Sequence, residues 1–300
     1  MAQYDRIYRL TIGNQGADGV VLEGKETSGG LNISFDITKD LTQQTNKASI
    51  KIYNLSEATA LKAEKDDAVV VLEAGYSEDA GLKCLFTGYI THVTTSSYGG
   101  GRVTELTASD GQIPIRDCVV SLSYAEAVSR KKVIADIASA MGVAVTYADN
   151  CEFTALANGF SFIGPGRECL KKACAGSDLS WSIQNNILQI IKEGGTTKTE
   201  ALKLTAASGL IGCVEKFTTA HFLADKNGSG SGAKAVKKKA RKAGYKLKCL
   251  MQPAITPGDL VYVASKTATG YFKVDRLTHT GDYAGASWYT DLEVHELTAS

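Results

Sequence analysis

The side chains best suited to acid–base chemistry in this 300-residue chain are its four histidines, His92, His221, His279 and His295. His279 precedes Asp282 by three residues in an expected turn, so the pair could act as a base and its orienting carboxylate. A hydrolase built on such a pair also needs a nucleophile, and no serine or cysteine lies in a G-x-S-x-G context. A histidine that stabilises the turn is the favoured interpretation. We therefore predict no catalytic residues and no enzyme.

Cofactor and metal chemistry has no recognisable motif either. The glycine run at residues 99–101 leads into Arg102 and a strand pattern, so it lacks the helix N-terminus that would hold a phosphate. The sequence contains no dinucleotide-binding fingerprint and no P-loop. The seven cysteines have neither CxxC spacing nor a nearby histidine partner: Cys84, Cys118, Cys151, Cys169, Cys174, Cys213 and Cys249. We expect no cofactor and no metal, and we predict reduced, mostly buried thiols.

Positive charge is concentrated in one segment, residues 226–246. The segment has no acidic residue, and its basic residues are Lys226, Lys234, Lys237, Lys238, Lys239, Arg241, Lys242 and Lys246. Because the whole chain has a net charge of +1, the rest of it sums to 1 minus 8, or −7. The front half, residues 227–232, has the composition of a flexible linker. These features predict a solvated, flexible loop over residues 225–246, between two strands.

Two binding roles for this segment stay open beside the solvated loop. It could contact an acidic patch on a neighbouring subunit, or it could face DNA through sequence-independent attraction. No aromatic residue interleaves the lysines to stack on bases, and Tyr245 at the end of the segment is the only candidate. The sequence therefore favours a protein partner over a nucleic acid.

The elements that would position these residues fall into three blocks. Residues 1–115 are dominated by apolar and polar residues in alternation, as at residues 31–38, which predicts strands. Ser56 is a natural N-cap for a short helix over residues 57–64. The first block is predicted to be a β-barrel domain with one helix.

The middle block, residues 116–198, changes to helical spacing. Helices are predicted over residues 127–141 and 167–175. A hairpin follows over residues 179–192, with its turn at Asn185 and Asn186. This block is predicted to be a small α+β domain.

Residues 199–300 return to the period of a strand and are predicted to form a second β-barrel domain. Its closing hairpin, residues 271–297, parallels residues 85–111 in the first block, because each has an aromatic start, a strand ending in Thr-His and a glycine-bearing turn. The match places His92 and His279 at equivalent positions and favours an internal duplication. The predicted fold class is therefore mainly β, with two similar antiparallel β-barrel domains flanking a small α+β domain.

Several of these segments resemble the baseplate hub proteins of contractile-tailed phages and related tail-like particles, the late control protein class. The resemblance covers most of the chain, and its motifs are structural. Residues 35–59 resemble the opening of the family's first barrel, residues 85–93 with 103–111 its closing hairpin, and residues 207–217 the link into its second barrel. In the C-terminal part the resemblance is carried by Pro257, Gly258, Asp259, Gly270, Val274, His279, Gly281, Asp282, Gly285, Trp288 and Thr290.

In the resembled hubs, three copies form a pseudo-six-fold ring that joins a six-fold tail tube to a three-fold central spike. The resemblance implies a structural virion protein of the tail baseplate, made in the host bacterial cytoplasm. It implies a homotrimer whose partners are the tail tube protein, the central spike protein and other baseplate proteins, with DNA or the tape-measure protein in the lumen. We expect intersubunit contacts on the exposed faces of residues 35–53 and 288–297. No apolar run reaches the length needed to span a bilayer.

Two alternatives belong to other functional classes. A monomeric host- or glycan-binding β module would cluster exposed aromatic side chains, but Trp181 and Trp288 lie in different blocks. A tail-associated cell-wall hydrolase would need a carboxylate or nucleophile motif, which the sequence lacks. The hub is therefore the favoured interpretation.

Overall fold

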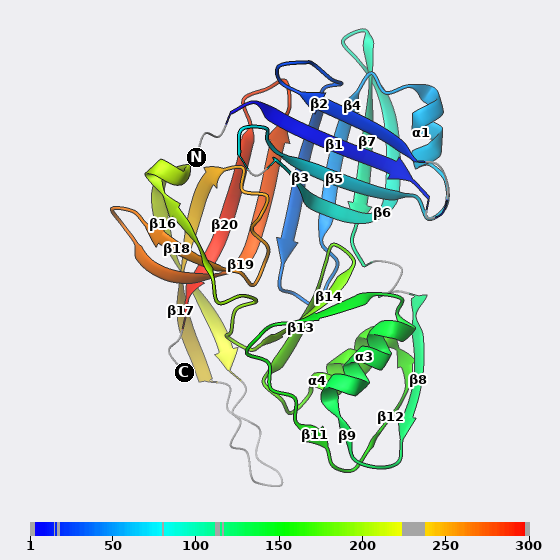
Figure 1. Cartoon of the computed structure of the whole chain (residues 1–300), viewed down its shortest axis with the longest axis vertical. Coiled ribbons are helices and arrows are strands. Elements are labelled where there is room, and N and C mark those ends of the chain that lie inside the picture. Colours follow the sequence, from blue (N-terminus) through cyan, green and yellow to red (C-terminus); the bar gives the residue numbers. More distant parts are fainter. Residues whose placement is uncertain are drawn as a thin grey trace.

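The computed structural model describes residues 4–14, 16, 19–79, 81–111, 115, 117–223 and 238–297. The chain forms two β units and a smaller unit of mixed α and β structure (Figure 1). We call them the N-terminal β unit (β1 to β7 with α1), the insert (β8 to β14 with α3 and α4) and the C-terminal β unit (β15 to β20). This mainly β architecture with an α+β insert confirms the predicted fold class.

The N-terminal β unit is built by alternating strands around one apolar core. In β3, Ile33, Phe35 and Ile37 are buried while the residues between them face outward. Ser56 caps α1 by accepting a hydrogen bond from the Thr59 amide, as predicted. The elements are β1 (Arg6–Gly13), β2 (Val20–Lys25), β3 (Ile33–Asp40), β4 (Lys47–Tyr53), α1 (Glu57–Ala63), β5 (Val69–Tyr76), β6 (Gly81–Tyr98) and β7 (Gly101–Ser109).

The insert has its own core between short sheets and two helices. The hairpin lies where it was predicted, because Asn185 (φ 54°) and Asn186 (φ 62°) both adopt the left-handed conformation of a two-residue hairpin turn. The first helix begins at Arg130 rather than residue 127, because Val128–Ser129 pair as a strand with β11. The elements are β8 (Val119–Tyr124), β9 (Val128–Ser129), α3 (Arg130–Ala140), β10 (Ala144–Tyr147), β11 (Ala155–Leu156), β12 (Phe160–Pro165), α4 (Gly166–Cys174), β13 (Leu179–Gln184) and β14 (Ile187–Lys192).

The C-terminal β unit corrects the prediction of a flexible loop over residues 225–246. Residues from Lys238 onward belong to strand β17, which pairs with β16 out to Leu223↔Lys238. Residues 224–237 lie outside the described part of the chain. The composition concealed this strand because lysine and alanine have low strand propensity, and pairing with β16 overrides it. The elements are β15 (Ala201–Thr205), a 3₁₀ turn (Ala206–Ser208), β16 (Leu210–Leu223), β17 (Lys238–Leu250), β18 (Leu260–Ala264), β19 (Thr269–Asp282) and β20 (Trp288–Glu296).

The two β units share one hydrogen-bonded sheet. Strand β19 pairs antiparallel with β3 from Arg276↔Asp40 to Asp282↔Ser34, and we call this pairing the seam. Across the seam the strand order is β16-β17-β20-β19-β3-β4-β7-β6, followed by β5, β1 and β2. The first eight strands of this path, the eight-strand run, cross from one unit into the other without a break.

The eight-strand run consists of two halves with the same internal order. One half is β16-β17-β20-β19 and the other is β3-β4-β7-β6. If the four strands of each half are numbered in chain order, both halves have the spatial order first, second, fourth, third. Both closing hairpins carry a β-bulge, between Val274 and Arg276 in β19 and between Ile90 and His92 in β6. His92 and Arg276 are each the first paired residue after the bulge, so they occupy equivalent positions in the two halves. The prediction that His92 matches His279 was therefore wrong by three residues, although the duplication itself has a structural counterpart.

Candidate functional site

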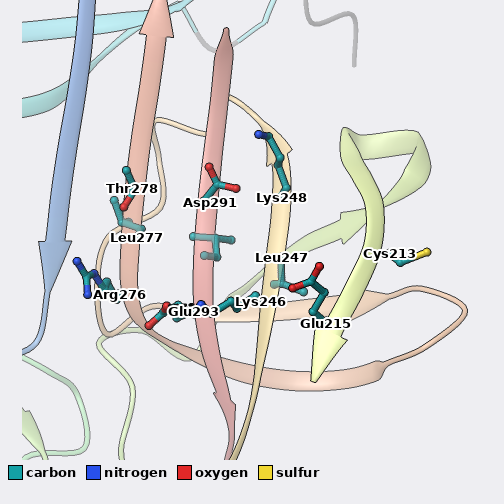
Figure 2. A pocket seen from close by; sticks show the side chains of 11 residues that line it. Cys213, Glu215, Lys246, Leu247, Lys248, Arg276, Leu277, Thr278, Asp291 and Glu293 are labelled. Carbon is teal, nitrogen blue, oxygen red and sulfur yellow. Dashed lines mark ion pairs between the residues drawn. The ribbon is translucent and has the colours of Figure 1, made fainter. Parts of the chain in front are cut away.

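One face of the eight-strand run carries rows of charged and hydroxyl side chains from β16 to β6. Because side chains alternate along each strand, the residues that face away from the apolar cores form rows across neighbouring strands. One row contains only charges of alternating sign on five successive strands. Its members, each paired in register with the next, are Glu215, Lys246, Glu293, Arg276 and Asp40. Figure 2 shows the first four side by side.

The charges in this row compensate one another. Lys246 Nζ lies 3.4 Å from Glu293 Oε1, and both side chains are partly exposed. In the next row Lys248 is paired in register with Asp291, and its ammonium also lies 4.6 Å from the centre of the Tyr289 ring. Exposed pairs of this kind contribute little to stability. Their main effect is that charges of opposite sign cancel locally, so the electrostatic potential at this face stays small.

The same pattern continues beyond the seam. Lys51 Nζ lies 3.9 Å from Glu105 Oε2, and Ser49 Oγ donates to Glu105 Oε1 at 2.8 Å. By the bulge alignment, Lys51 and Glu105 occupy the places of Lys248 and Asp291 in the other half. The repeat therefore preserves a charge pair as well as a strand order.

Hydroxyl groups bridge the seam on this face. Thr280 Oγ1 donates to Asp36 Oδ2 at 3.2 Å, and the Thr38 and Thr278 hydroxyls are 3.3 Å apart. The surface is hollowed by three concavities of about 510, 290 and 420 Å³: the first lies over β16, β17, β20 and β19, and the other two lie along β19, β3 and β4, the last reaching β7. The face thus presents a concave wall with hydroxyl groups and charges of both signs.

A buried polar junction fixes the insert against the N-terminal β unit. Asp110 accepts hydrogen bonds from the amide and the side chain of Asn46, both at 2.8 Å, and from the Asn185 amide at 3.0 Å. Lys39 Nζ donates to Asn185 Oδ1 at 2.6 Å. Burial lowers the pKa of Lys39 to about 8, against the opposing charge of Asp110. The left-handed Asn185 thus closes the hairpin and also docks it.

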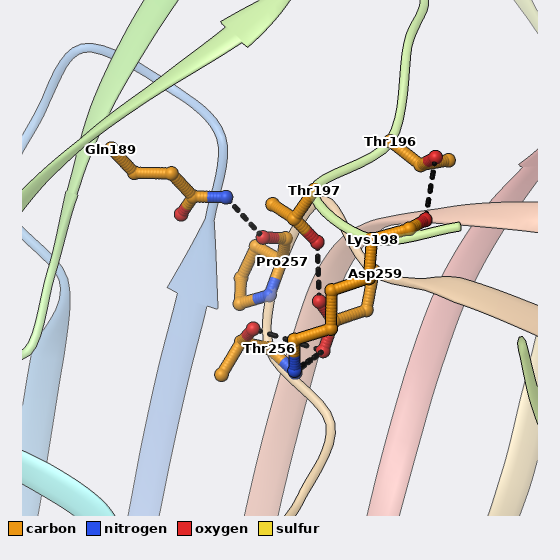
Figure 3. A network of polar contacts seen from close by, with 7 residues as sticks. All are labelled: Gln189, Thr196, Thr197, Lys198, Thr256, Pro257 and Asp259. Atoms are coloured by element: carbon orange, nitrogen blue, oxygen red, sulfur yellow. Dashed lines mark hydrogen bonds and ion pairs between the residues drawn. The ribbon is translucent and has the colours of Figure 1, made fainter. Parts of the chain in front are cut away.

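A second network of polar contacts joins the insert to the C-terminal β unit (Figure 3). Asp259 accepts from the Thr256 amide at 2.9 Å and from the Thr256 hydroxyl at 3.0 Å, and it also accepts from the Thr197 hydroxyl. Gln189 Nε2 donates to the Pro257 carbonyl at 3.2 Å. The Pro-Gly-Asp motif singled out in the sequence is therefore a structural clamp that holds the eight-strand run and the insert together.

The predicted base and carboxylate pair is not formed. His279 lies within strand β19 rather than in a turn, is fully buried and has Nδ1 2.9 Å from Thr290 Oγ1. Asp282 lies three residues further along the strand, on the opposite face. Burial, reinforced by Lys39, lowers the pKa of His279 to about 3, so the imidazole is neutral at ordinary pH. This histidine is part of a packed core.

The other histidines are dispersed. His92 is exposed on β6, and its Nε2 lies 2.9 Å from Thr94 Oγ1. His295 pairs through Nδ1 with Asp275, a contact that the sequence did not reveal because a bulge brings Asp275 to it. His221 lies on β16. No group of three or more His, Cys, Asp or Glu residues could hold a metal ion within the described ranges.

The cysteines agree with the prediction in part. All seven are free. Burial raises the pKa of Cys169 and Cys174 to about 11 and that of Cys249 to about 12, so these thiols stay protonated. Cys84 and Cys213 are exposed, which contradicts the expectation for those two, because each faces outward near a β-bulge.

The structure brings together only part of the predicted basic site. Lys238, Lys239, Arg241 and Lys242 lie on β17, paired with residues Leu223 to Thr219 of β16, and Lys246 belongs to the charged row. Lys226, Lys234 and Lys237 lie outside the described residues. The alternation of Lys246 with Lys248 and of Asp291 with Glu293 was visible in the sequence. Their arrangement into rows was not, because it depends on the register of five strands.

Comparison with known proteins identifies the group to which this architecture belongs. The family model for baseplate hub gp41 matches residues 11–218. No curated protein matches the sequence. Among the described helices, none is long and apolar enough to cross a membrane.

Solved tail proteins share the fold at low sequence identity. The 43 kDa tail protein of prophage MuSo2 from Shewanella oneidensis is 11% identical, with 96% of this chain and 98% of that chain covered and a TM-score of 0.59. A tail protein from Neisseria meningitidis is 12% identical, with 96% of each chain covered and a TM-score of 0.60. The Escherichia coli c3393 protein, a component of the type VI secretion system, is 9% identical over 94% of this chain and 76% of that chain, with a TM-score of 0.54.

The resemblance to baseplate hubs is thus confirmed over most of the chain. The matched family model spans more than half of it, and the tail proteins share its fold over nearly their whole length. This chain belongs to the baseplate hub gp41 family.

Proposed function

We propose that three copies of this chain form a ring in the tail baseplate and that the polar face of the eight-strand run lines its channel. The observation that carries the proposal is the pair of equivalent four-strand halves joined by the seam. Three copies would supply six such halves, an arrangement that matches a six-fold tail tube. The single insert of each copy would keep the other side three-fold, which matches a three-fold spike.

The chemistry of the polar face supports its placement on a channel. A sheet with one face on apolar cores must keep its other face solvated, and a water-filled lumen meets that need. Positive and negative side chains such as Lys246 and Glu293 compensate one another, so DNA or a tape-measure protein passing along the wall would meet no strong net charge. The hub would thus connect the tail tube protein and the central spike protein and leave the lumen open.

The basic end of β17 is proposed to contact a partner in the baseplate. Pairing of β20 with β17 ends at Gly244↔His295, so the stretch from Lys238 to Ala243 extends beyond β20 and pairs with β16 alone. A two-stranded ribbon is marginally stable by itself in water, and its four basic residues fit an acidic neighbour. The most direct partner is an acidic surface of another baseplate subunit.

A structural, non-enzymatic role in the virion follows from this assignment. Its support is that His279, the histidine at which catalysis was considered, is buried and neutral and lies on the opposite face of β19 from Asp282. The protein would be made in the cytoplasm of the host bacterium and incorporated into the tail.

Solution mass tests the ring. Light scattering at several concentrations, alone and with the purified tube and spike proteins of the same particle, should give a species near three times 31.8 kDa or its complex with the partners. A chain that stays monomeric alone and with both partners would overturn the hub and favour a monomeric binding module. Turnover of purified peptidoglycan would overturn the non-enzymatic assignment.

A further inference from the structure

The eight-strand run ends in two strand edges that have no partner strand in the described chain. Strand β6 pairs with β5 only as far as Tyr89, and from His92 to Tyr98 it pairs with β7 alone. At the other end, β16 pairs with no strand except β17. The Val214 carbonyl accepts a hydrogen bond from the Thr267 hydroxyl at 3.1 Å, so the open stretch of β16 begins at Glu215. Each copy therefore offers one open edge at either end of the run, on opposite sides of the molecule in Figure 1.

The β6 edge has none of the usual protection against pairing. Exposed edges are commonly blunted by lysine, proline or inward-pointing charges. The segment from Thr91 to Ser97 contains only threonine, serine, valine and His92, and all of its residues except Val93 are exposed. Threonine and valine favour strand pairing. This edge is chemically ready to accept another strand.

The seam provides an internal template for the partner. Inside the chain, the last strand of one half, β19, pairs with the first strand of the other half, β3. In the repeated order the equivalent strands are β6, the last of its half, and β16, the first of its half. We infer that β6 of one copy pairs antiparallel with β16 of the next copy. The inference rests on the ring proposed above and names the joint that closes it.

The bulges also fix the register of this joint. The residue that follows each bulge starts a row of residues paired in register across the four strands of its half. In one half this row is His92, Thr107, Ser49 and Asp36. In the other half it is Arg276, Glu293, Lys246 and Glu215. Glu215 therefore takes the place of Asp36. Ser96, four residues after His92, takes the place of Thr280, four residues after Arg276.

The chemistry of the seam is reproduced at these positions. Thr280 Oγ1 donates to Asp36 Oδ2 at 3.2 Å within the chain. The same register between copies sets the Ser96 hydroxyl opposite the Glu215 carboxylate, and both side chains are exposed in the single chain. A second copy of this chain is thus the occupant that matches the edge in strand direction, register and hydrogen-bonding groups. Because the two surfaces differ, the contact is head-to-tail and can close into a ring.

A disulfide trap tests the register. The full chain would carry Ser96→Cys and Glu215→Cys, with the exposed Cys84 and Cys213 changed to serine. Residues directly opposite in an antiparallel pair have Cβ atoms about 4.5–5.5 Å apart, close to disulfide reach. Mild oxidation should give covalent dimers and closed trimers that disappear on reduction. The matched control, Ser97→Cys with Glu215→Cys, shifts one residue to the other face of the sheet and should cross-link at least tenfold less.

A charge test on the same pair provides a second readout. Ser96→Asp sets a like charge against Glu215 and should reduce the trimer fraction measured by light scattering, and adding Glu215→Lys should restore it. A trimeric mass with equal cross-linking in the Ser96 and Ser97 variants would overturn the joint and leave the ring standing. A monomeric mass in every sample would overturn the ring and the joint together.

Discussion

Phe35 and Trp288 meet edge to face across the boundary between the two β units, with ring centroids 5.4 Å apart and planes inclined by 70°. Both rings are buried in the core of the N-terminal β unit, although Trp288 begins the last strand of the C-terminal unit. Gly281 leaves the space that the Phe35 ring occupies. The seam is thus reinforced by an aromatic contact that depends on a residue without a side chain.

Substitution of Gly281 should lower the free energy of unfolding of the two β units, which are joined at the seam. A Cβ atom at this position would lie 2.2 Å from Phe35 Cζ, so Gly281→Ala must displace the ring. Overpacking of this kind costs about 1–3 kcal/mol, which should appear in the free energy of unfolding measured with urea. Gly19→Ala is the matched control, because its Cβ would come no closer than 3.4 Å to the backbone. Equal stability of the two variants would contradict the close packing.

His279 should make the protein sensitive to acid. Its pKa is lowered from 6.5 to about 3 in the folded chain, so below pH 6.5 the unfolded state binds a proton that the folded state does not. Stability is therefore complete above pH 6.5 and falls as the pH drops towards 3, by up to about 5 kcal/mol. Urea unfolding at pH 7 and pH 4 should show a smaller loss for His279→Gln than for the wild type. An identical loss would assign the acid sensitivity to other groups.

Asp110 should hold the insert in place. Its carboxylate accepts three hydrogen bonds and its charge acts on the buried Lys39, so Asp110→Ala leaves two backbone amides without their acceptor and Lys39 without a compensating charge. Removal of one partner of a buried charge pair costs about 3–5 kcal/mol. Chemical denaturation should show this loss, whereas alanine at the exposed Asp149 should stay within about 0.5 kcal/mol of the wild type. A small effect at Asp110 would mean that the junction is not a main determinant of stability.

Removal of acidic charge from the polar face should expose an affinity for DNA. The variant Glu215→Gln, Asp291→Asn, Glu293→Gln leaves Lys246 and Lys248 without their neighbours of opposite charge, whereas Arg276 keeps Asp40 beside it. Affinity for duplex DNA should rise, and the slope of log K against log salt should steepen by up to about 1.8 per copy, since two cations become available. Fluorescence anisotropy over a salt series measures both.

Two controls isolate the face in that experiment. All proteins would carry glutamine at the seven basic positions from Lys226 to Lys242, so that β17 and its flanking segment add no background. The comparison protein would carry Glu64→Gln, Asp66→Asn and Asp67→Asn, exposed residues just after α1 that change the net charge equally. Equal salt slopes for the two triple variants would show that the charge rows do not mask their cations.

Local chemistry made some elements predictable. The Asn185 and Asn186 pair fixed the hairpin turn because both residues tolerate positive φ, and Ser56 fixed the start of α1 because its hydroxyl caps the first turn. Both signals act within a few residues. They are read correctly from the sequence because no distant contact opposes them.

Features that depend on distant pairing were missed or misplaced. The basic stretch from Lys238 is a strand only because β16 pairs with it, and His279 is buried because it lies on the inner face of β19, next to Thr290 of β20. The match of His92 with His279 followed identical letters, whereas the bulges show that Arg276 is the equivalent residue. The candidate site was invisible for the same reason, since its charged rows exist only when five strands are in register.

The seam also determines how the two β units carry force. Its hydrogen bonds join main-chain groups over seven residue pairs, from Arg276↔Asp40 to Asp282↔Ser34, in antiparallel strands. A pull along the strands loads all of these bonds at once, whereas a pull across them would open the pairs one after another. The two halves of the chain therefore act as a single stiff plate along the strand direction, and in the proposed ring any rearrangement under axial load would occur at the contacts between copies.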